Sequence, residues 1–431
     1  MTSQTSIPAI DDSAITSETE VSPVSIPTDI TFNRENIEKY LHNKVRLVNS
    51  QDGLDQFCYT SCDKNEPEIV KECRGVIFNK NELVSKCFSY TTEFTENDND
   101  EIVSLNLDFN NCKFYTAYEG CTVKVFFYNG SWHISTNRKL NGFLSKWASK
   151  TSFGDFFLEA LTYQFENNKR LKENHPFEKG VNDPIEVFSR CVLDKSKQYV
   201  FLLLNNSENR IVCNSPENPT IFHIGTFTNN NGEFTLSMDD DIYIPYPESH
   251  SFTKMKDIYD FVYSSNYMNI QGIIIFAPNN KQYKILNIDY KDLYNVRGNE
   301  PSIPYRYLQV RMDSDKKEMI NFLYPSSIPI FDEYENHLYD TAKFIYTSYV
   351  DRFINKKTVT IPKEEYHIMS QAHTWYQSDR DHNRISIDKI IEIINIQKPT
   401  HLNAIIRKIK LENKKKLQEK KEDKQHKRLL P

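Results

Sequence analysis

The sequence predicts an α+β fold, in which antiparallel sheets with flanking helices are followed by a small all-α C-terminal domain. The first observation comes from residues 114–140, where two β-rich runs flank Asn129-Gly130, a strong signal for a two-residue hairpin. The second is a change beyond Asn321, where apolar residues recur at three- and four-residue intervals, as in amphipathic helices. The third is size, because 431 residues with 39% hydrophobic side chains can form two domains with real cores.

Four regions follow from the changes in composition along the chain. Residues 1–29 are rich in Ser, Thr and Pro without periodicity, and we expect a disordered leader there. Residues 30–315 are predicted to form the strand-rich domain and residues 316–405 the helical domain. Residues 406–431 form a basic, charged tail.

Charge is unevenly distributed between these regions. From Arg407 to the end, eleven Lys or Arg stand against four Asp or Glu, so this part carries +7 while the whole chain carries −6. The rest of the chain, near −13, is too acidic to favour broad contact with a phosphate backbone. The tail is interpreted as a solvated surface, with nucleic-acid or nuclear-import contact as the alternative.

The lengths of the apolar runs and the spacing of the cysteines indicate the cellular compartment of the protein. No run approaches the roughly 20 apolar residues of a membrane span, and no secretory signal is visible, so we expect an intracellular protein without membrane contact. The eight cysteines are scattered without a C-x-x-C pair, which favours reduced thiols over a zinc site. His367, His373 and His382 are close in sequence but match no ligand spacing, so no metal site is predicted.

The elements of the first domain follow from the hydrophobic pattern in chain order. Helices are expected at 36–41 and at 153–161, where aromatic residues recur at helical spacing. Residues 99–111 are interpreted as a loop or short strand, and residues 305–312 as a final strand or the start of a helix. Strands are expected at 45–49, 72–79, 83–88, 121–128, 131–136, 222–227, 271–276 and 282–286, with two more inside 199–212 around a polar turn.

The second domain is predicted from its apolar stripes. The first stripe consists of Phe331, Tyr334, Leu338, Ala342, Ile345 and Tyr349. Ser386 is expected to cap a second helix that ends near Pro399, and a last helix begins at His401 and leads into the tail. This helical region is also a candidate surface for a protein partner.

Five short motifs occur in order within the first domain. They are Glu-Cys-Arg-Gly at 72–75, Ala-Tyr-Glu-Gly at 117–120, Ser-Thr-Asn-Arg at 135–138, Asn-Arg-Ile-Val at 209–212 and Gln-Gly-Ile-Ile-Ile at 271–275. Together they resemble the covalent nucleotidyltransferases (RNA ligases, DNA ligases and capping enzymes), and above all the adenylation domain of the phage RNA ligase 1 type. The resemblance implies an ATP-grasp-like ligase domain that would use ATP and Mg²⁺ if it were active.

The resemblance also implies which residues contact a nucleotide. Two belong to the signature K-x-(D/E)-G, one is an aromatic residue that would pack on adenine, and the rest are basic residues for phosphate or RNA. In this sequence they are Arg74, Glu119, Gly120, Arg138, Phe201, Arg210 and Lys284.

Three positions depart from the family pattern. Ala117 stands where the signature Lys would take the nucleotide as a phosphoramidate. Leu202 replaces the Glu that contacts ribose, and Gln271 replaces the Glu that helps to place the divalent metal. Lys113 and Lys124 are nearby, but strand alternation makes either a poor substitute for the missing nucleophile.

The sequence therefore favours a ligase-like protein without ligase activity, which binds a nucleotide or an RNA end through its remaining basic residues. A second hypothesis is an active ATP-dependent RNA ligase with Lys113 or Lys124 as a displaced nucleophile. A third is a structural or virion-associated protein in which the cleft is vestigial. A surplus of Asn, Lys, Ile and Tyr would suit a large DNA virus or a protist.

Overall fold

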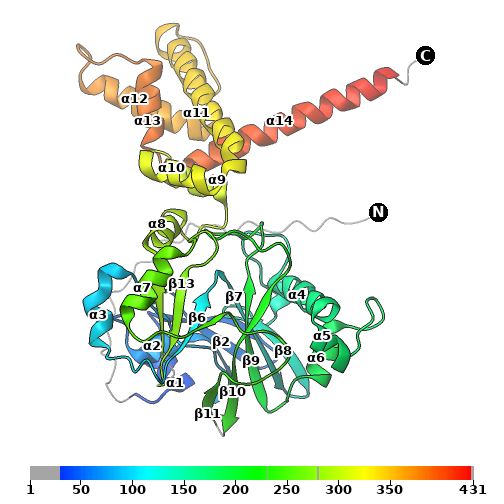
Figure 1. Cartoon of the computed structure of the whole chain (residues 1–431). Helices are drawn as coiled ribbons and strands as arrows, with labels where there is room; N and C mark the ends of the chain where they lie inside the picture. The colour runs from blue at the N-terminus through cyan, green and yellow to red at the C-terminus, as the bar shows by residue number, and fades with distance from the viewer. Residues whose placement is uncertain (1–29, 231, 279–280, 429–431) are drawn as a thin grey trace.

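A computed structural model describes residues 30–230, 232–278 and 281–428, with three sheets below and a cluster of helices above them in Figure 1. The predicted leader, residues 1–29, lies outside the described residues. Among the described helices, none has the length and apolar character that a membrane crossing requires. The architecture is mixed α+β with antiparallel sheets and a helical C-terminal region, as the sequence predicted.

The strands form three sheets, and within each sheet every strand is hydrogen-bonded to the next one named. The first sheet is β1 (Val45–Gln51), β2 (Leu54–Tyr59), β3 (Arg74–Asn79) and β4 (Glu82–Ser85). The second sheet is β11 (Glu233–Ser237), β10 (Ile221–Asn230), β9 (Lys197–Leu204), β7 (Gly120–Tyr128) and β8 (Ser131–Thr136). The third sheet is β12 (Ser249–His250), β6 (Lys113–Ala117), β13 (Gly272–Phe276), β14 (Gln282–Leu286) and β5 (Thr92–Phe94). All pairings are antiparallel except that of β14 with β5.

The hairpin predicted from Asn129-Gly130 is confirmed. Strands β7 and β8 pair from Val123 opposite Thr136 to Tyr128 opposite Ser131, which leaves the two turn residues between them. Asn129 has φ 47° and Gly130 has φ 83°, the positive values that a type I′ turn requires at both positions.

Helices cover the outer faces of the sheets. On the second sheet, α4 (Phe153–Asn167) begins at a capping box formed by Ser152 and Asp155 and packs Phe157 against Phe201 of β9. On the third sheet, α7 (Met255–Ser264) buries Ile258 and Val262. The remaining helices of this part are α1 (Arg34–Tyr40), α2 (Glu68–Glu72), α3 (Asn99–Ser104), α5 (Lys169–Asn174), α6 (Pro184–Cys191) and α8 (Ile288–Arg297).

The C-terminal helices are α9 (Ile303–Val310), α10 (Ser314–Leu323), α11 (Ile328–Tyr349), α12 (Lys363–Ser378), α13 (Ile387–Asn395) and α14 (Pro399–Arg428). All of them except α10 share one apolar core, while Ile320 of α10 packs in a neighbouring cluster with Tyr307 and Phe331. The predicted stripe on α11 is buried, and Leu308 of α9 packs into the same core. Ser386 caps α13 by accepting the backbone N–H of Lys389, as predicted.

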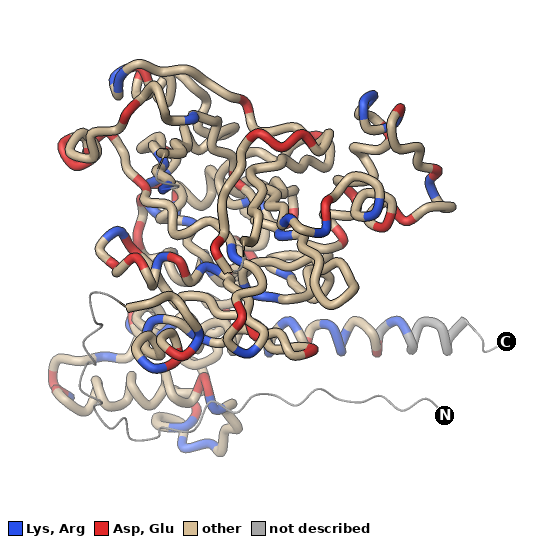
Figure 2. Tube along the Cα trace, turned by 90° about the horizontal axis from the view of Figure 1, so that it is seen from below, with Lys and Arg blue, Asp and Glu red and all other residues tan. Residues whose placement is uncertain are grey.

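The basic C-terminal segment continues as helix. Figures 1 and 2 show α14 extending clear of the other helices, with Lys and Arg repeated along it. Residues 411–419 are all exposed, in agreement with the predicted solvated surface.

Three local predictions need correction. Residues 99–111, expected as a loop or short strand, begin with helix α3 and contain no strand. Residues 209–212 form no strand, because the neighbouring backbone amides of 211–213 are taken up by the side chain of Glu119. Pro399 does not end α13, which stops at Asn395; instead it opens α14, a position where its missing N–H costs nothing.

We expect the stability of the fold to fall at low pH because of the buried side chain of His223 on β10. Its ring is fully buried against Tyr246, with Nε2 3.0 Å from Thr226 Oγ1, and burial lowers its pKa to about 4. The neutral ring is favoured in the folded state, so this stabilisation is complete above the usual pKa near 6.5 and is lost as the pH falls towards 4. We expect the free energy of unfolding to fall by about 3 kcal/mol over that window through this residue alone.

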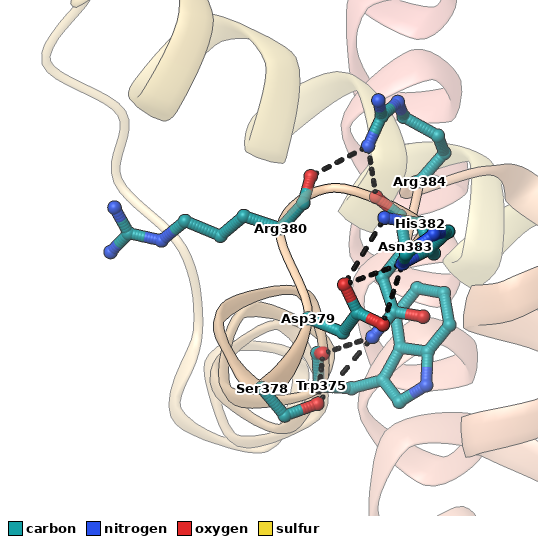
Figure 3. Close-up of polar contacts among 7 residues, drawn as sticks. All are labelled: Trp375, Ser378, Asp379, Arg380, His382, Asn383 and Arg384. Carbon is teal, nitrogen blue, oxygen red and sulfur yellow. Dashed lines mark hydrogen bonds and ion pairs between the residues drawn. The ribbon is translucent and has the colours of Figure 1, made fainter.

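Urea unfolding at pH 7 and pH 4.5 measures that loss. The variant H223N should show a smaller difference between the two pH values than the parent chain. H382N is the control, since His382 is an exposed residue that binds Asp379 in the turn after α12 (Figure 3). An unchanged pH dependence in H223N would contradict the assignment.

Candidate functional site

A cavity of about 270 Å³ lies between the inner faces of the second and third sheets. Alternate residues of β13 and β14 point into it because side chains on a strand have a period of two. Seven of the ten positions singled out in the sequence line this cavity: Arg74, Ala117, Glu119, Gly120, Leu202, Gln271 and Lys284. Ile211 of the 209–212 motif lines it too, so the structure brings together four of the five motifs and the strand that carries Lys284.

The Ala117–Gly120 motif closes one wall of the cavity. Ala117 is the last residue of β6 and pairs with Gly272 of β13, while its carbonyl accepts the N–H of Gln271 at 2.8 Å. Gly120 opens β7 so close to the backbone of Leu203 that a Cβ would collide with the Leu203 carbonyl. Leu202 packs beside Gly120, which places the two altered positions, 117 and 202, on the same cavity wall.

A chain of hydrogen bonds runs through the polar end of the cavity. Lys284 Nζ donates to Gln271 Oε1 at 3.0 Å, and Gln271 Nε2 donates to the Tyr290 hydroxyl at 2.7 Å. Tyr290 donates in turn to Glu119 Oε1 at 3.0 Å. The Glu119 carboxylate also accepts the backbone N–H groups of residues 211–213 at 3.1 to 3.2 Å. Gln271 is thus fully engaged, and Glu119 holds a backbone segment in place.

Burial and these partners act on Glu119 in opposite directions. Desolvation raises the pKa of the carboxyl group, whereas the amide hydrogen bonds and Tyr290 act to lower it. Burial also raises the pKa of Tyr290 well above its ordinary value, so its hydroxyl keeps its proton and acts as a donor to Glu119.

Positive charge gathers at the same end. Lys284 Nζ lies 3.7 Å from Glu93 Oε1, and Lys291 Nζ lies 2.5 Å from Glu93 Oε2. Arg74 also lines the cavity and donates to the carbonyl of Ser89 at 3.3 Å. Burial lowers the pKa of Lys284, although Glu93 partly opposes this shift. Three cations around one ion-paired carboxylate leave an excess of positive charge for an anionic ligand.

The opposite end of the cavity is apolar and aromatic. Phe276 packs edge-on against Phe88 and Tyr115, with ring centroids 5.7 and 5.8 Å apart. Ile224 and Met238 complete this end from the second sheet. A flat, apolar group would find van der Waals contact here, whereas a charged group would lose its hydration without a polar partner.

Three predicted contact residues lie elsewhere. Phe201 faces the core under α4, because strand alternation turns Leu202, and not Phe201, into the cavity. Arg210 donates to the carbonyls of Val212, Cys213 and Leu323, which ties the 209–213 segment to the end of α10. Arg138 is exposed, with only a 3.5 Å contact to the carbonyl of Tyr59. None of the three lines this cavity.

The two lysines considered as displaced nucleophiles also lie outside the cavity. Lys113 forms an exposed ion pair with Asp239 at 2.5 Å. Lys124 is fully buried and donates to the carbonyl of Gly75, and desolvation lowers its pKa to about 8. Lys284 is the one lysine that lines the cavity among the described residues.

The residues present do not fit a Mg²⁺ site. Mg²⁺ prefers carboxylates and water, but position 271 offers an amide whose oxygen already faces the Lys284 ammonium. The carboxylates of Glu93 and Glu119 are both occupied by other partners. Within the described ranges, no group of three or more His, Cys, Asp or Glu is placed to hold a metal ion.

Glu93, Tyr290 and Lys291 were not singled out in the sequence. Tyr290 and Lys291 sit in the first turn of α8, which Asn287 caps by accepting the backbone N–H of Asp289 at 2.9 Å. Glu93 lies on β5, next to Lys284 of β14 in the parallel pair. No local motif marks these residues, because they reach the cavity only through the packing of distant elements.

Several proteins similar to this chain come from viruses. No protein-family model matches the sequence. The chain is 27% identical over 335 residues to an "Immediate-early protein ICP-46 homolog" of Invertebrate iridescent virus 6, which covers 74% of this chain and 71% of that protein. It is 25% identical over 247 residues to a "Putative bifunctional polynucleotide kinase/RNA ligase" of Autographa californica nuclear polyhedrosis virus, which covers 55% of this chain and 33% of that protein.

Among solved structures, the chain is similar to a putative ATP-dependent DNA ligase from Aquifex aeolicus. The TM-score is 0.36 and the sequence identity 13%, with 80% of each chain covered. The virus relatives agree with the origin suggested by the composition.

Proposed function

We propose that this chain is a ligase-like protein of the nucleotidyltransferase superfamily that binds a nucleotide, free or at an RNA end, without covalent transfer. One observation carries the proposal: Arg74, Glu119, Gly120 and Lys284 surround Ala117 in a single cavity. These residues come from separate motifs that the resemblance to RNA ligases had linked. The similarity to a virus protein named a putative polynucleotide kinase/RNA ligase supports the same superfamily.

The form of the cavity supports binding. Its aromatic end suits a nucleobase, and its cationic end, with Arg74, Lys284 and Lys291 around Glu93, suits phosphate. A nucleotide presents these two chemistries at opposite ends, as the cavity does.

The same cavity argues against covalent transfer. Phosphoramidate formation requires an amine at the place that Ala117 occupies, and Lys113 and Lys124 are held outside. The Gln271 amide and its Lys284 partner also disfavour a divalent metal at the position that the resemblance assigns to it.

Incubation with radiolabelled ATP or GTP and Mg²⁺, followed by denaturing electrophoresis, tests the proposal. We expect no covalent adduct, while calorimetry of the same protein detects binding of the nucleotide. An acid-labile adduct would contradict the proposal. Mass spectrometry of such an adduct would identify the modified residue, and Lys284 is the lysine that lines the cavity among the described residues. Absence of binding to ATP, GTP and 5′-phosphorylated RNA at low salt would favour the structural alternative.

Lys284 is expected to be the strongest single contact to phosphate. The variant K284Q keeps a polar side chain beside Gln271 but removes the charge, so nucleotide binding should weaken by roughly ten- to a hundredfold, as expected for a charge-assisted hydrogen bond. The matched control is K256Q on α7, where an exposed lysine pairs with Asp260. Equal dissociation constants for K284Q and the parent chain would contradict the assignment.

A further inference from the structure

Gln282 has a buried hydrogen-bond donor without a partner. The residue opens β14 and is only 4% exposed, and its Oε1 accepts the hydroxyl of Thr91 at 2.9 Å. Its Nε2 has no hydrogen-bond partner in the part of the chain that the structure describes. A buried amide donor without an acceptor is costly, and in native proteins nearly all such donors are hydrogen-bonded.

The position of Gln282 links this donor to the cavity. Gln282 lines the cavity and pairs with Phe276 of β13, the ring at the centre of the aromatic end. Lys284 lies two residues further along the same face of β14, roughly 7 Å away. The unpartnered donor is therefore at the aromatic end, and Lys284 is one strand repeat away.

We infer that Gln282 recognises the nucleobase, by donating from Nε2 to a ring nitrogen or carbonyl oxygen on the edge of a base packed against Phe276. This inference rests on the proposed function and adds the residue that makes binding depend on the base. Thr91 holds the amide oxygen, so the amide presents its donor to the ligand. An acceptor on the base satisfies that donor, whereas an amino group at the same point leaves it unpaired.

Phosphate binding should not involve Gln282. Arg74 and Lys284 provide the charge for phosphate, and a neutral amide at the aromatic end adds little to it. Inorganic tripolyphosphate, which lacks a base and a sugar, is therefore a probe for the cationic end alone.

Calorimetry with ATP, GTP, CTP, UTP and tripolyphosphate tests the inference on the full chain. The variant Q282E keeps the oxygen that accepts from Thr91 and replaces the donor with an acceptor. We expect the best nucleotide of the parent chain to bind Q282E at least tenfold more weakly. Tripolyphosphate meets only the repulsion of the added carboxylate, so its affinity should fall by a smaller factor. The matched control is Q418E on the exposed part of α14, which should bind every probe as the parent chain does.

A second variant is needed because the buried carboxylate of Q282E can by itself destabilise the fold. Q282L removes the unpartnered donor without adding charge, so its melting temperature without ligand should stay within a few degrees of the parent value. The increase in melting temperature caused by the best nucleotide should shrink in Q282L, whereas the increase caused by tripolyphosphate should remain.

The outcomes separate this inference from the proposed function. Equal nucleotide affinities in Q282E, Q282L and the parent chain would overturn the role of Gln282 while leaving nucleotide binding intact. Parallel losses for nucleotides and tripolyphosphate would also overturn it, since they would show a general effect on the cavity. If the parent chain bound neither nucleotide nor tripolyphosphate, the proposed function and the inference would both fall.

Discussion

The triple variant A117K/L202E/Q271E is expected to form a covalent, acid-labile nucleotide adduct that the parent chain does not form. The side chain at position 117 faces the cavity, so a lysine there would place an amine near Arg74 and Lys284. Neighbouring cations and burial lower the pKa of an amine and leave more of it neutral and nucleophilic. A carboxylate at position 271 would add an oxygen ligand that Mg²⁺ prefers, and one at position 202 would restore the group that the resemblance assigns to ribose.

The single variant A117K should label roughly a hundredfold more slowly than the triple variant, because it lacks the carboxylate that would hold Mg²⁺ beside the transferring phosphoryl group. The control is A117M/L202E/Q271E, which has the same two carboxylates but no amine at position 117. Transfer of radiolabel from ATP, measured after denaturation, compares the proteins. A triple variant that folds and binds ATP but takes no label would show that these three positions do not account for the missing activity.

Local chemistry decided which parts of the fold were predictable. The hairpin at Asn129 and Gly130 was predictable because its two residues favour positive φ whatever surrounds them. Ser386 was a correct helix cap for the same reason. Residues 209–212 look like a strand in sequence, but their neighbouring amides bond to Glu119, about ninety positions earlier in the chain. No local pattern encodes that contact.

In the candidate site, too, local patterns were predictable and contacts between distant elements were not. The order of the motifs was enough to predict that Arg74, Glu119 and Lys284 lie in one cavity. Each of these residues lies within a paired strand or next to one. Strand alternation could have predicted that Phe201 and Leu202 face opposite sides, a signal that the motif comparison overlooked. Tyr290 reaches Glu119 from a helix 171 residues away, and nothing in its own surroundings indicates this role.

Glu119→Ala is expected to lower the free energy of unfolding by about 3–5 kcal/mol, because it leaves several buried donors without an acceptor. The Glu119 side chain accepts from the amides of residues 211–213 and from Tyr290, in a site where Glu119 itself is 6% exposed. The same segment is tied to α10 through Arg210, so its loss should also loosen the helical region from the sheets. Chemical denaturation measures the first effect, and proteolysis near residue 323 the second.

The variant E119Q separates the role of Glu119 as a hydrogen-bond acceptor from the role of its charge. Its amide oxygen can still accept from the 211–213 amides, and since burial raises the pKa of Glu119, removal of the charge itself should cost little. We expect E119Q to lose about 1–2 kcal/mol, and the exposed control E208A less than about 0.5 kcal/mol. A small effect of E119A would contradict this role. A large effect in E119A with a small one in E119Q would mean that the Glu-Gly pair serves folding, so a chain without the nucleophile can still require it.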